Sequence, residues 1–409
     1  MLRNIVIVGA GQAAAQAVDT MRRRGFEGSI VLVGDEPHEP YQRPPLSKDF
    51  LAGNLDAERL RVRPPRFYTD RRVDLELGTP VVAIDRDLRR IRLASGAWLP
   101  YDSLLLATGS RPHRLAVAGA ALDGIHYLRT LADAESLRAE LKPGRRLVVV
   151  GGGYLGLEVA ATARLLGTEV TVLELTPRMM SRVASPEVSA FFAEEHTRRG
   201  VRLLNGVQVT GFAASPGSGH VSTVQCADGT QHAADVVLVG IGVAPAQELA
   251  VQAGLECSNG IIVDDHCRTR DAQVYAAGDC TRHPALRYGF DVRLESVDNA
   301  FEQGASAALN LLGIETRHDK VPWFWSDQFD LKLVTVGLRD DYDATVLRGE
   351  PAGRSFSVCY LRRGELLAID TVNAPRDQLA ARKLIAARAV VDSAKLRDAA
   401  IALKDCVVA

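Results

Sequence analysis

The sequence has few cysteines, and none is paired at a spacing used for disulfide or metal chemistry. The six cysteines are scattered through 409 residues without C-x-x-C or C-x4-C spacing, and none precedes Cys226. The nine histidines show no metal-ligand spacing with cysteine or acidic residues. We therefore expect reduced, mostly structural thiols in a cytoplasmic protein, and no metal site.

Long apolar runs and an excess of one charge are also missing. Met1 leads directly into the strand-like residues 5–8, so we expect neither a signal peptide nor a membrane span. The net charge of -1 gives no reason to expect a nucleic-acid or membrane-surface protein. With 47% hydrophobic and 24% charged residues, the composition is that of a soluble globular protein, and 409 residues suffice for two or three domains.

The chain does contain a glycine-rich turn between an apolar strand and a helical run. This turn, in "NIVIVGAGQAA", carries Gly9-x-Gly11-x-x-Ala14, and the next strand, "SIVLVGDE", ends in an acidic pair that begins at Asp35. In such a βαβ unit the first glycine makes the turn, the second admits a pyrophosphate, and the small third residue lets the helix pack on the strand. The acid can accept a hydrogen bond from a ribose hydroxyl. One such turn is weak evidence, because glycines also end strands for structural reasons.

The pattern recurs in the middle of the chain. The stretch "RRLVVVGGGYLGLEVAATARLLGTEVTVLEL" carries Gly151-x-Gly153-x-x-Gly156, a helix and a strand that ends at Glu174. Two complete units are far more specific than one, and they predict two dinucleotides. The useful pair is one that exchanges a hydride, namely FAD and a nicotinamide.

A later strand assigns FAD to the first unit. The stretch "TRDAQVYAAGD" ends in a Gly-Asp pair and resembles the second FAD fingerprint, in which Asp279 holds a ribityl hydroxyl through a glycine turn before a helix. Asp279 otherwise simply caps a helix or turn. We expect an FAD domain split over residues 1–111 and 244–322, an NAD domain over 112–243 and a C-terminal domain over 323–409.

Strings along essentially the whole chain resemble one family. They include "GDEPHEPYQRPPLSKDFLAG", "YLRTLADAESLR", "RLESVDNAFEQ", "PWFWSDQFDLKL" and "FSVCYLRRGELLAIDTVNAP". The chain resembles the FAD-dependent NADH:ferredoxin reductases of bacterial oxygenase systems, which serve cytochromes P450 or ring-hydroxylating dioxygenases. The resemblance implies an α/β protein of the glutathione-reductase-like fold, with two Rossmann-type dinucleotide-binding domains and a C-terminal α+β domain. It also implies hydride transfer from NADH to FAD and single-electron transfer to an acidic 2Fe–2S ferredoxin that docks at the flavin edge.

The segment "RPPLSK" stands where many relatives on this fold carry a cysteine pair beside the flavin. Without a thiol there, electrons must pass directly from the flavin to an acceptor. The resemblance implies that Lys48 lies near the reactive side of the flavin ring and that Glu158 is its carboxylate partner. Residue statistics alone favour a solvated lysine near a helix start that the preceding serine can cap.

The resemblance implies further contacts with the two cofactors, although each residue could instead belong to ordinary core, caps or surface. Glu174 predicts NADH over NADPH, because a carboxylate accepts from the ribose and repels a 2′-phosphate, while Arg178 and Arg182 could soften the choice. Trp325 is implied to cap the flavin near the electron exit; Trp323, Phe324 and Trp325 otherwise form a sheet core. The remaining contacts implied for FAD are Ala13 in the pyrophosphate turn, Asp35 at the ribose, Val81 on the adenine side, Arg129 at the cofactor's polar part, and Asp279 and Val297 by the ribityl chain and ring. Arg43 is also expected to bind the cofactor.

Basic residues after the lysine segment predict a rim that steers an acidic partner. The candidates are Arg63, Arg66, Arg71 and Arg72, although most such residues simply form a solvated face.

The C-terminal part is predicted to contain four strands and two helices. The strands are "KLVTVGL", "ATVLRG", "FSVCYL" and "LLAIDTV", and the helices are "QLAARKLIAARAV" and "AKLRDAAIALK". The last helix would place Leu396, Ala399, Ala400 and Leu403 on one face, which we expect to be core rather than membrane-binding.

Two other functions stay open at this point. One is an NADH oxidase, peroxidase or quinone reductase on the same fold, although the oxidase and peroxidase types usually need a cysteine beside the flavin. The other is a redox-sensing interaction protein like apoptosis-inducing factor.

Overall fold

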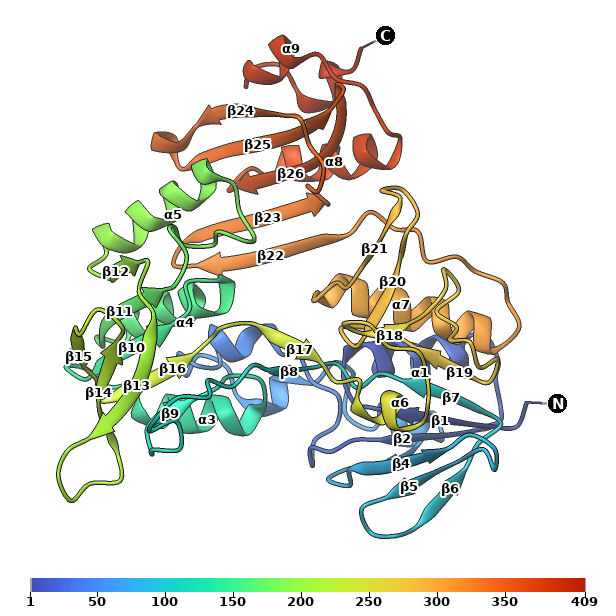
Figure 1. Ribbon diagram of the computed structural model, residues 1–409. Helices are drawn as coiled ribbons and strands as arrows, with labels where there is room; N and C mark the ends of the chain where they lie inside the picture. The colour runs from blue at the N-terminus through green and yellow to red at the C-terminus, as the bar shows by residue number, and fades with distance from the viewer. Residues whose placement is uncertain (1, 409) are drawn as a thin grey trace. The chain divides into compact units, whose positions relative to one another are not determined.

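The computed structural model describes residues 2–408, which form two compact units (Figure 1). Unit 1 comprises residues 2–42, 58–111 and 244–322; unit 2 comprises residues 43–57, 112–243 and 323–408. The segment 43–57, which contains the lysine motif, thus packs with the second unit. Strands β8 (Ser110–Pro112) and β17 (Val243–Pro245) pair with each other.

Unit 1 is built on a five-stranded sheet of order β19-β7-β1-β2-β3 whose strands are parallel. Residues 5–8 are buried on both faces of the sheet, which is why this strand reads as a continuous apolar run. Helices α1 and α7 pack closely because Gly304 faces Ala13; a Cβ at Gly304 would lie 2.4 Å from the Ala13 carbonyl oxygen. The elements are β1 (Asn4–Val8), α1 (Gln12–Arg23), β2 (Ser29–Val33), β3 (Asp74–Glu76), β7 (Ser103–Leu106), β19 (Val274–Ala276) and α7 (Val297–Leu311).

Smaller elements complete unit 1. One three-stranded antiparallel sheet follows the order β4-β5-β6, and another sheet follows the order β18-β20-β21. Their bounds, with those of two short helices, are α2 (Phe67–Asp70), β4 (Val81–Asp85), β5 (Arg90–Leu93), β6 (Trp98–Pro100), α6 (Glu248–Gln252), β18 (Ile261–Ile262), β20 (Thr281–Ala285) and β21 (Phe290–Val292).

Unit 2 contains a second parallel sheet, of order β12-β11-β10-β16-β9. Helix α5 begins where the Ser185 hydroxyl accepts from the Val188 amide and Pro186 occupies the first helical position. The elements are β9 (Ile125–His126), α3 (Leu131–Glu140), β10 (Arg146–Val150), α4 (Tyr154–Leu165), β11 (Glu169–Glu174), α5 (Pro186–Arg198), β12 (Arg202–Asn205), β13 (Val209–Ala214), β14 (Val221–Cys226), β15 (Gln231–Ala233) and β16 (Val236–Val239).

The C-terminal part of unit 2 is a five-stranded antiparallel sheet of order β22-β23-β26-β25-β24. The four strands predicted from alternating patterns are confirmed as β23 to β26. The elements are β22 (Trp323–Gln328), β23 (Leu331–Gly337), β24 (Ala344–Glu350), β25 (Ser355–Arg362), β26 (Glu365–Val372), α8 (Pro375–Ala386) and α9 (Ser393–Arg397).

The helix predicted over residues 394–404 is wrong beyond Arg397. Buried Arg348 donates to four backbone carbonyls of this stretch, which are therefore not left to bond within a helix. Of the residues predicted to share one face of this helix, Leu396 and Leu403 are buried, whereas the two alanines at 399 and 400 are exposed. Over residues 2–408, no helix combines the length and the apolar character that crossing a bilayer requires.

Candidate functional site

The first glycine turn has the geometry of a pyrophosphate cradle. Gly9 has φ +110°, and a Cβ there would lie 2.1 Å from the Ala107 carbonyl oxygen, so only glycine fits. Gly11 caps the N-terminus of α1, and a Cβ there would meet no atom of the described chain within 4 Å. The open space faces unpaired amides at a helix N-terminus, which suits a phosphate. Ala14 is fully buried, as the packing role of the third small residue requires.

The second glycine turn repeats this geometry in unit 2. Gly151 has φ +107°, and a Cβ there would lie 2.3 Å from the Gly240 carbonyl oxygen. Gly153 caps α4 and faces space that is open within 4 Å of any described atom, while a Cβ at Gly156 would lie 2.1 Å from the Gly151 carbonyl oxygen. The residues present at both turns therefore fit a dinucleotide pyrophosphate.

The Asp279 turn differs from its predicted context. The prediction of a following helix is wrong, since strand β20 begins at Thr281. The Ser110 hydroxyl donates to Asp279 Oδ2 at 2.9 Å, and the side-chain oxygen of Gln303 accepts from the Gly278 amide at 2.8 Å. Ser110 and Gln303 hold this turn from elsewhere in the chain. Gln303 ends the family string "RLESVDNAFEQ", but that string implied no role for it.

Several residues implied as FAD contacts also lie in unit 1. Ala13 lies in the first turn of α1 rather than in the loop, and is buried. Asp35 is exposed and follows β2 after one glycine. Val81 begins strand β4, and Val297 begins helix α7. Both valines are partly exposed, so neither is ordinary core.

The acid at the end of β11 is held firmly by its own loop. Glu174 Oε2 accepts from the Gly152 amide at 2.6 Å, and Oε1 accepts from the Thr176 amide and hydroxyl at 2.8 Å. The Arg178 guanidinium donates to the carbonyls of residues 181, 184 and 185, so it is occupied within the loop. The Arg182 side chain is exposed beside this loop.

Lys48 and Glu158 form an ion pair within unit 2. Lys48 Nζ lies 2.7 Å from Glu158 Oε2, and Glu158 is 6% exposed. The Ser47 hydroxyl donates to Oε2 at 2.6 Å, and the Ser326 hydroxyl donates to Oε1 at 2.7 Å. Ser47 therefore does not cap a helix start: it ends the short 3-10 helix Pro44–Ser47 and binds the carboxylate. Ser47 and Ser326 were not predicted as site residues.

The aromatic run of β22 is not a closed sheet core. Trp323, Phe324 and Trp325 are all partly exposed. Trp323 and Trp325 stack with ring centroids 5.4 Å apart, and Arg382 lies 4.2 Å over the Trp323 ring. Phe324 points to the other face and stacks on Tyr154. Trp325 is the chain neighbour of Ser326 and so lies beside the residue that contacts Glu158.

The predicted arginines fall into different environments. Arg43 Nη1 donates to the Arg129 carbonyl at 2.7 Å, which brings together two residues implied as FAD contacts. Arg63 pairs with Asp19 at 3.1 Å and is only 18% exposed, so it does not belong to an exposed basic rim. Arg66 and Arg72 are exposed and Arg71 is partly exposed.

The thiols are unsuited to redox chemistry. All six cysteines are free, and desolvation by burial raises the pKa of each of them, that of Cys359 to about 12. Because the thiolate is the reactive form, these cysteines are poor electron carriers.

Comparisons with known proteins agree with this geometry. Residues 3–304 match the family described as pyridine nucleotide-disulphide oxidoreductase, and residues 323–407 match a reductase C-terminal domain. The chain is 44% identical to putidaredoxin reductase CamA of Pseudomonas putida, covering 99% of this chain and 97% of that protein. It is 46% identical to rhodocoxin reductase of Rhodococcus erythropolis, covering 94% and 89%. The crystal structure of the covalent putidaredoxin reductase–putidaredoxin complex matches with a TM-score of 0.96 over 99% of this chain and 98% of that chain.

Proposed function

Because the chain belongs to the pyridine nucleotide-disulphide oxidoreductase family, we propose that it is an FAD-dependent NADH:ferredoxin reductase. It takes a hydride from NADH and delivers single electrons to an acidic 2Fe–2S ferredoxin. That ferredoxin supplies a cytochrome P450 or a ring-hydroxylating dioxygenase. The near full-length likeness to two reductases named for their electron-carrier partners supports this function.

The observation that carries the proposal is the Lys48–Glu158 pair in a segment that has no cysteine. Bound FAD would supply the two-electron to one-electron conversion that this reaction needs. Beside it, the Lys48 ammonium would stabilise the electron-rich reduced state, and Glu158 holds Lys48 in place at 2.7 Å. Hydride transfer needs no general acid or base, so these residues act by positioning and by charge.

The two glycine turns would bind the pyrophosphates of the two dinucleotides. The turn at Gly9 and Gly11 would take FAD, with Asp279 at the ribityl chain, and the turn at Gly151 and Gly153 would take NADH. Glu174, fixed by three hydrogen bonds, would receive the ribose hydroxyls.

Thiol-dependent peroxidase chemistry has little support in this chain. A peroxidatic cysteine needs a lowered pKa, and burial raises the pKa of all six thiols. The free thiols support a reducing compartment, and we place the protein in the cytoplasm.

The test is reduction of cytochrome c by NADH with and without an added 2Fe–2S ferredoxin. We expect ferredoxin to raise the rate strongly, and raised salt to slow the ferredoxin step while flavin reduction by NADH changes little. Equal turnover with oxygen or a quinone, unaffected by ferredoxin, would overturn the proposal.

A further inference from the structure

A chain of buried hydrogen bonds ends on the Glu158 carboxylate. His196 Nε2 lies 2.8 Å from Gln328 Oε1, Gln328 Nε2 donates to Ser326 Oγ at 3.1 Å, and the Ser326 hydroxyl donates to Glu158 Oε1 at 2.7 Å. His196, Gln328 and Ser326 are each 0% exposed. Ser326 and Gln328 alternate along β22, so both side chains lie on the same face of the strand.

The order of donors along this chain fixes the direction of the serine hydroxyl. A serine hydroxyl rotates freely and can donate to any acceptor in reach. Because Gln328 Nε2 already donates to the Ser326 oxygen, the Ser326 hydrogen is left to point at Glu158. A Gln328 amide turned the other way would present its oxygen to Ser326 and draw the hydroxyl away from the carboxylate.

The orientation of the Gln328 amide matches one tautomer of His196. Desolvation by burial lowers the pKa of His196 to about 4, so the imidazole is neutral at ordinary pH, and the tautomer with hydrogen on Nε2 is the one that donates to Gln328 Oε1. Within residues 2–408, His196 Nδ1 has no hydrogen-bond partner. The His196 ring is also fixed by packing on Phe329, whose centroid lies 5.0 Å away.

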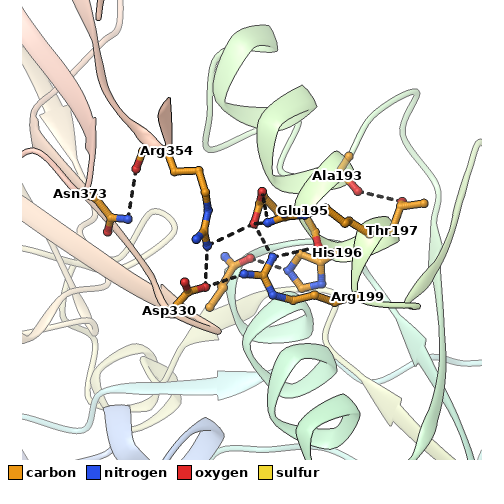
Figure 2. A network of polar contacts seen from close by, with 10 residues as sticks. Ala193, Glu195, His196, Thr197, Arg199, Asp330, Arg354 and Asn373 are labelled. Atoms are coloured by element: carbon orange, nitrogen blue, oxygen red, sulfur yellow. Dashed lines mark hydrogen bonds and ion pairs between the residues drawn. The ribbon is translucent and has the colours of Figure 1, made fainter. Parts of the chain in front are cut away.

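The charges near His196 pair with one another rather than with the imidazole (Figure 2). Glu195 binds Arg198, Arg199 and Arg354, and Asp330 binds Arg199 and Arg354. Glu158 in turn has electrostatic neighbours in Lys48 and Tyr154, and burial raises the pKa of Tyr154 so that it stays neutral. The chain from His196 thus delivers an oriented dipole, not a charge, to Glu158.

We propose that Ser326, oriented through Gln328 and His196, is a positioning residue that keeps the Glu158 carboxylate directed at Lys48. A buried carboxylate is costly unless its oxygens are hydrogen-bonded, and Ser326 is the hydroxyl donor to Oε1, whereas Ser47 and Lys48 both bind Oε2. The role of this hydrogen-bond chain in flavin reduction rests on the proposed function, whereas its effect on Glu158 does not depend on that function.

The first test is the limiting rate of flavin reduction at saturating NADH, measured by stopped flow without ferredoxin. Ser326→Ala should slow this rate about 10-fold, because the carboxylate that holds Lys48 loses one hydrogen bond, while the apparent Kd for NADH changes little. Ser357→Ala is the matched control, since this buried serine donates at 2.9 Å to a different carboxylate, that of Asp377. Ser326→Thr, which retains the hydroxyl, should restore the wild-type rate. A wild-type rate for Ser326→Ala would overturn the proposal.

The second test asks whether Gln328 acts through Ser326. Gln328→Leu should slow flavin reduction in part, and should slow it no further when Ser326 is already alanine. Equal effects of Gln328→Leu in both backgrounds would show that Gln328 acts independently of the serine.

The third test is a double-mutant cycle on stability, which requires no NADH and no ferredoxin. Ser326→Ala should lower the urea midpoint more in the wild type than in a Glu158→Gln background, because the lost bond is to the carboxylate. Ser357→Ala should lower the urea midpoint by the same amount in both backgrounds. Additivity for Ser326 and Glu158 would contradict the proposed contact. If NADH fails to reduce the flavin but the cycle is non-additive, the proposed function is wrong and the Ser326–Glu158 contact still stands.

Discussion

At the scale of single residues, the environment of Lys48 determines what its charge can do. Its Nζ is held by Glu158 at 2.7 Å and by the Pro44 carbonyl at 3.2 Å, so the ammonium is fixed rather than solvated. Glu158 is itself bound by two serine hydroxyls. A charge fixed in this way can stabilise a developing negative charge without reorganisation.

Lys48→Met should leave FAD bound and slow flavin reduction by NADH on the order of 10- to 100-fold, because a preorganised charge is lost. Glu158→Gln should slow it in the same direction, since Lys48 loses its partner. Stopped-flow absorbance of the flavin measures both rates, and flavin content per chain checks binding. Lys142→Met, at an exposed lysine of the same unit, is the control. Wild-type rates in both site variants would remove Lys48 from the site.

The nucleotide preference is also set by single residues. We expect kcat/KM at least about 10-fold higher with NADH than with NADPH, because Glu174 would face the 2′-phosphate as a like charge. Arg178 does not offset it, as its guanidinium is bound to backbone carbonyls. Glu174→Ser should reduce the preference for NADH over NADPH, whereas Glu169→Ser, at the exposed start of β11, should leave this preference unchanged. Equal kcat/KM for both nucleotides in the wild type would contradict this account.

At the scale of elements, periodic patterns predicted much of the fold and missed its exceptions. Strands β23 and β24 alternate buried and more exposed positions, whereas β25 and β26 are short runs buried along almost their whole length; both patterns are typical of strands, so these strands were predictable. The end of α9 was not, because it depends on Arg348, a residue some fifty positions earlier in the chain. The glycine turns carry their own signal, whereas Ser326, Gln328 and Gln303 each act on a partner distant in sequence, namely Glu158, His196 and Gly278.

The dependence of the C-terminal segment on Arg348 can be measured. Arg348→Met should destabilise the protein by about 3–5 kcal/mol, because partly buried carbonyls and the Asp377 carboxylate lose their guanidinium donor. Arg362→Met should cost about 0–1 kcal/mol, since its partner Asp341 is 82% exposed. Urea unfolding followed by circular dichroism compares the two. Equal midpoints would mean that Arg348 does not secure this segment.

At the scale of the whole molecule, three buried histidines set the acid limit of stability. Desolvation lowers the pKa of His196 and His283 to about 4 and that of His318 to about 3. A histidine in the unfolded chain has a pKa of about 6.5, so between pH 6.5 and 4 the unfolded chain binds more protons than the folded protein does. Stability is therefore fully present above about pH 6.5 and falls as pH is lowered, by up to about 1.4 kcal/mol per pH unit for each histidine.

Urea unfolding at pH 7.5, 6 and 5 checks this window, and replacing His318 with Asn should make the slope shallower. Carboxylates whose pKa is lowered, such as Asp235 at about 2, contribute only at lower pH. Stability that is constant from pH 7.5 to 5 would show that these histidines are not buried in neutral form.

The whole molecule is proposed to pass electrons from flavin to ferredoxin with no thiol between them. Anaerobic titration of the FAD-loaded protein with dithionite tests this most directly, because it counts every redox group that exchanges electrons with the flavin. A redox-active disulfide would add two electrons to the two that the flavin accepts. The account predicts full reduction at two electrons per FAD; uptake of four electrons per FAD would contradict it.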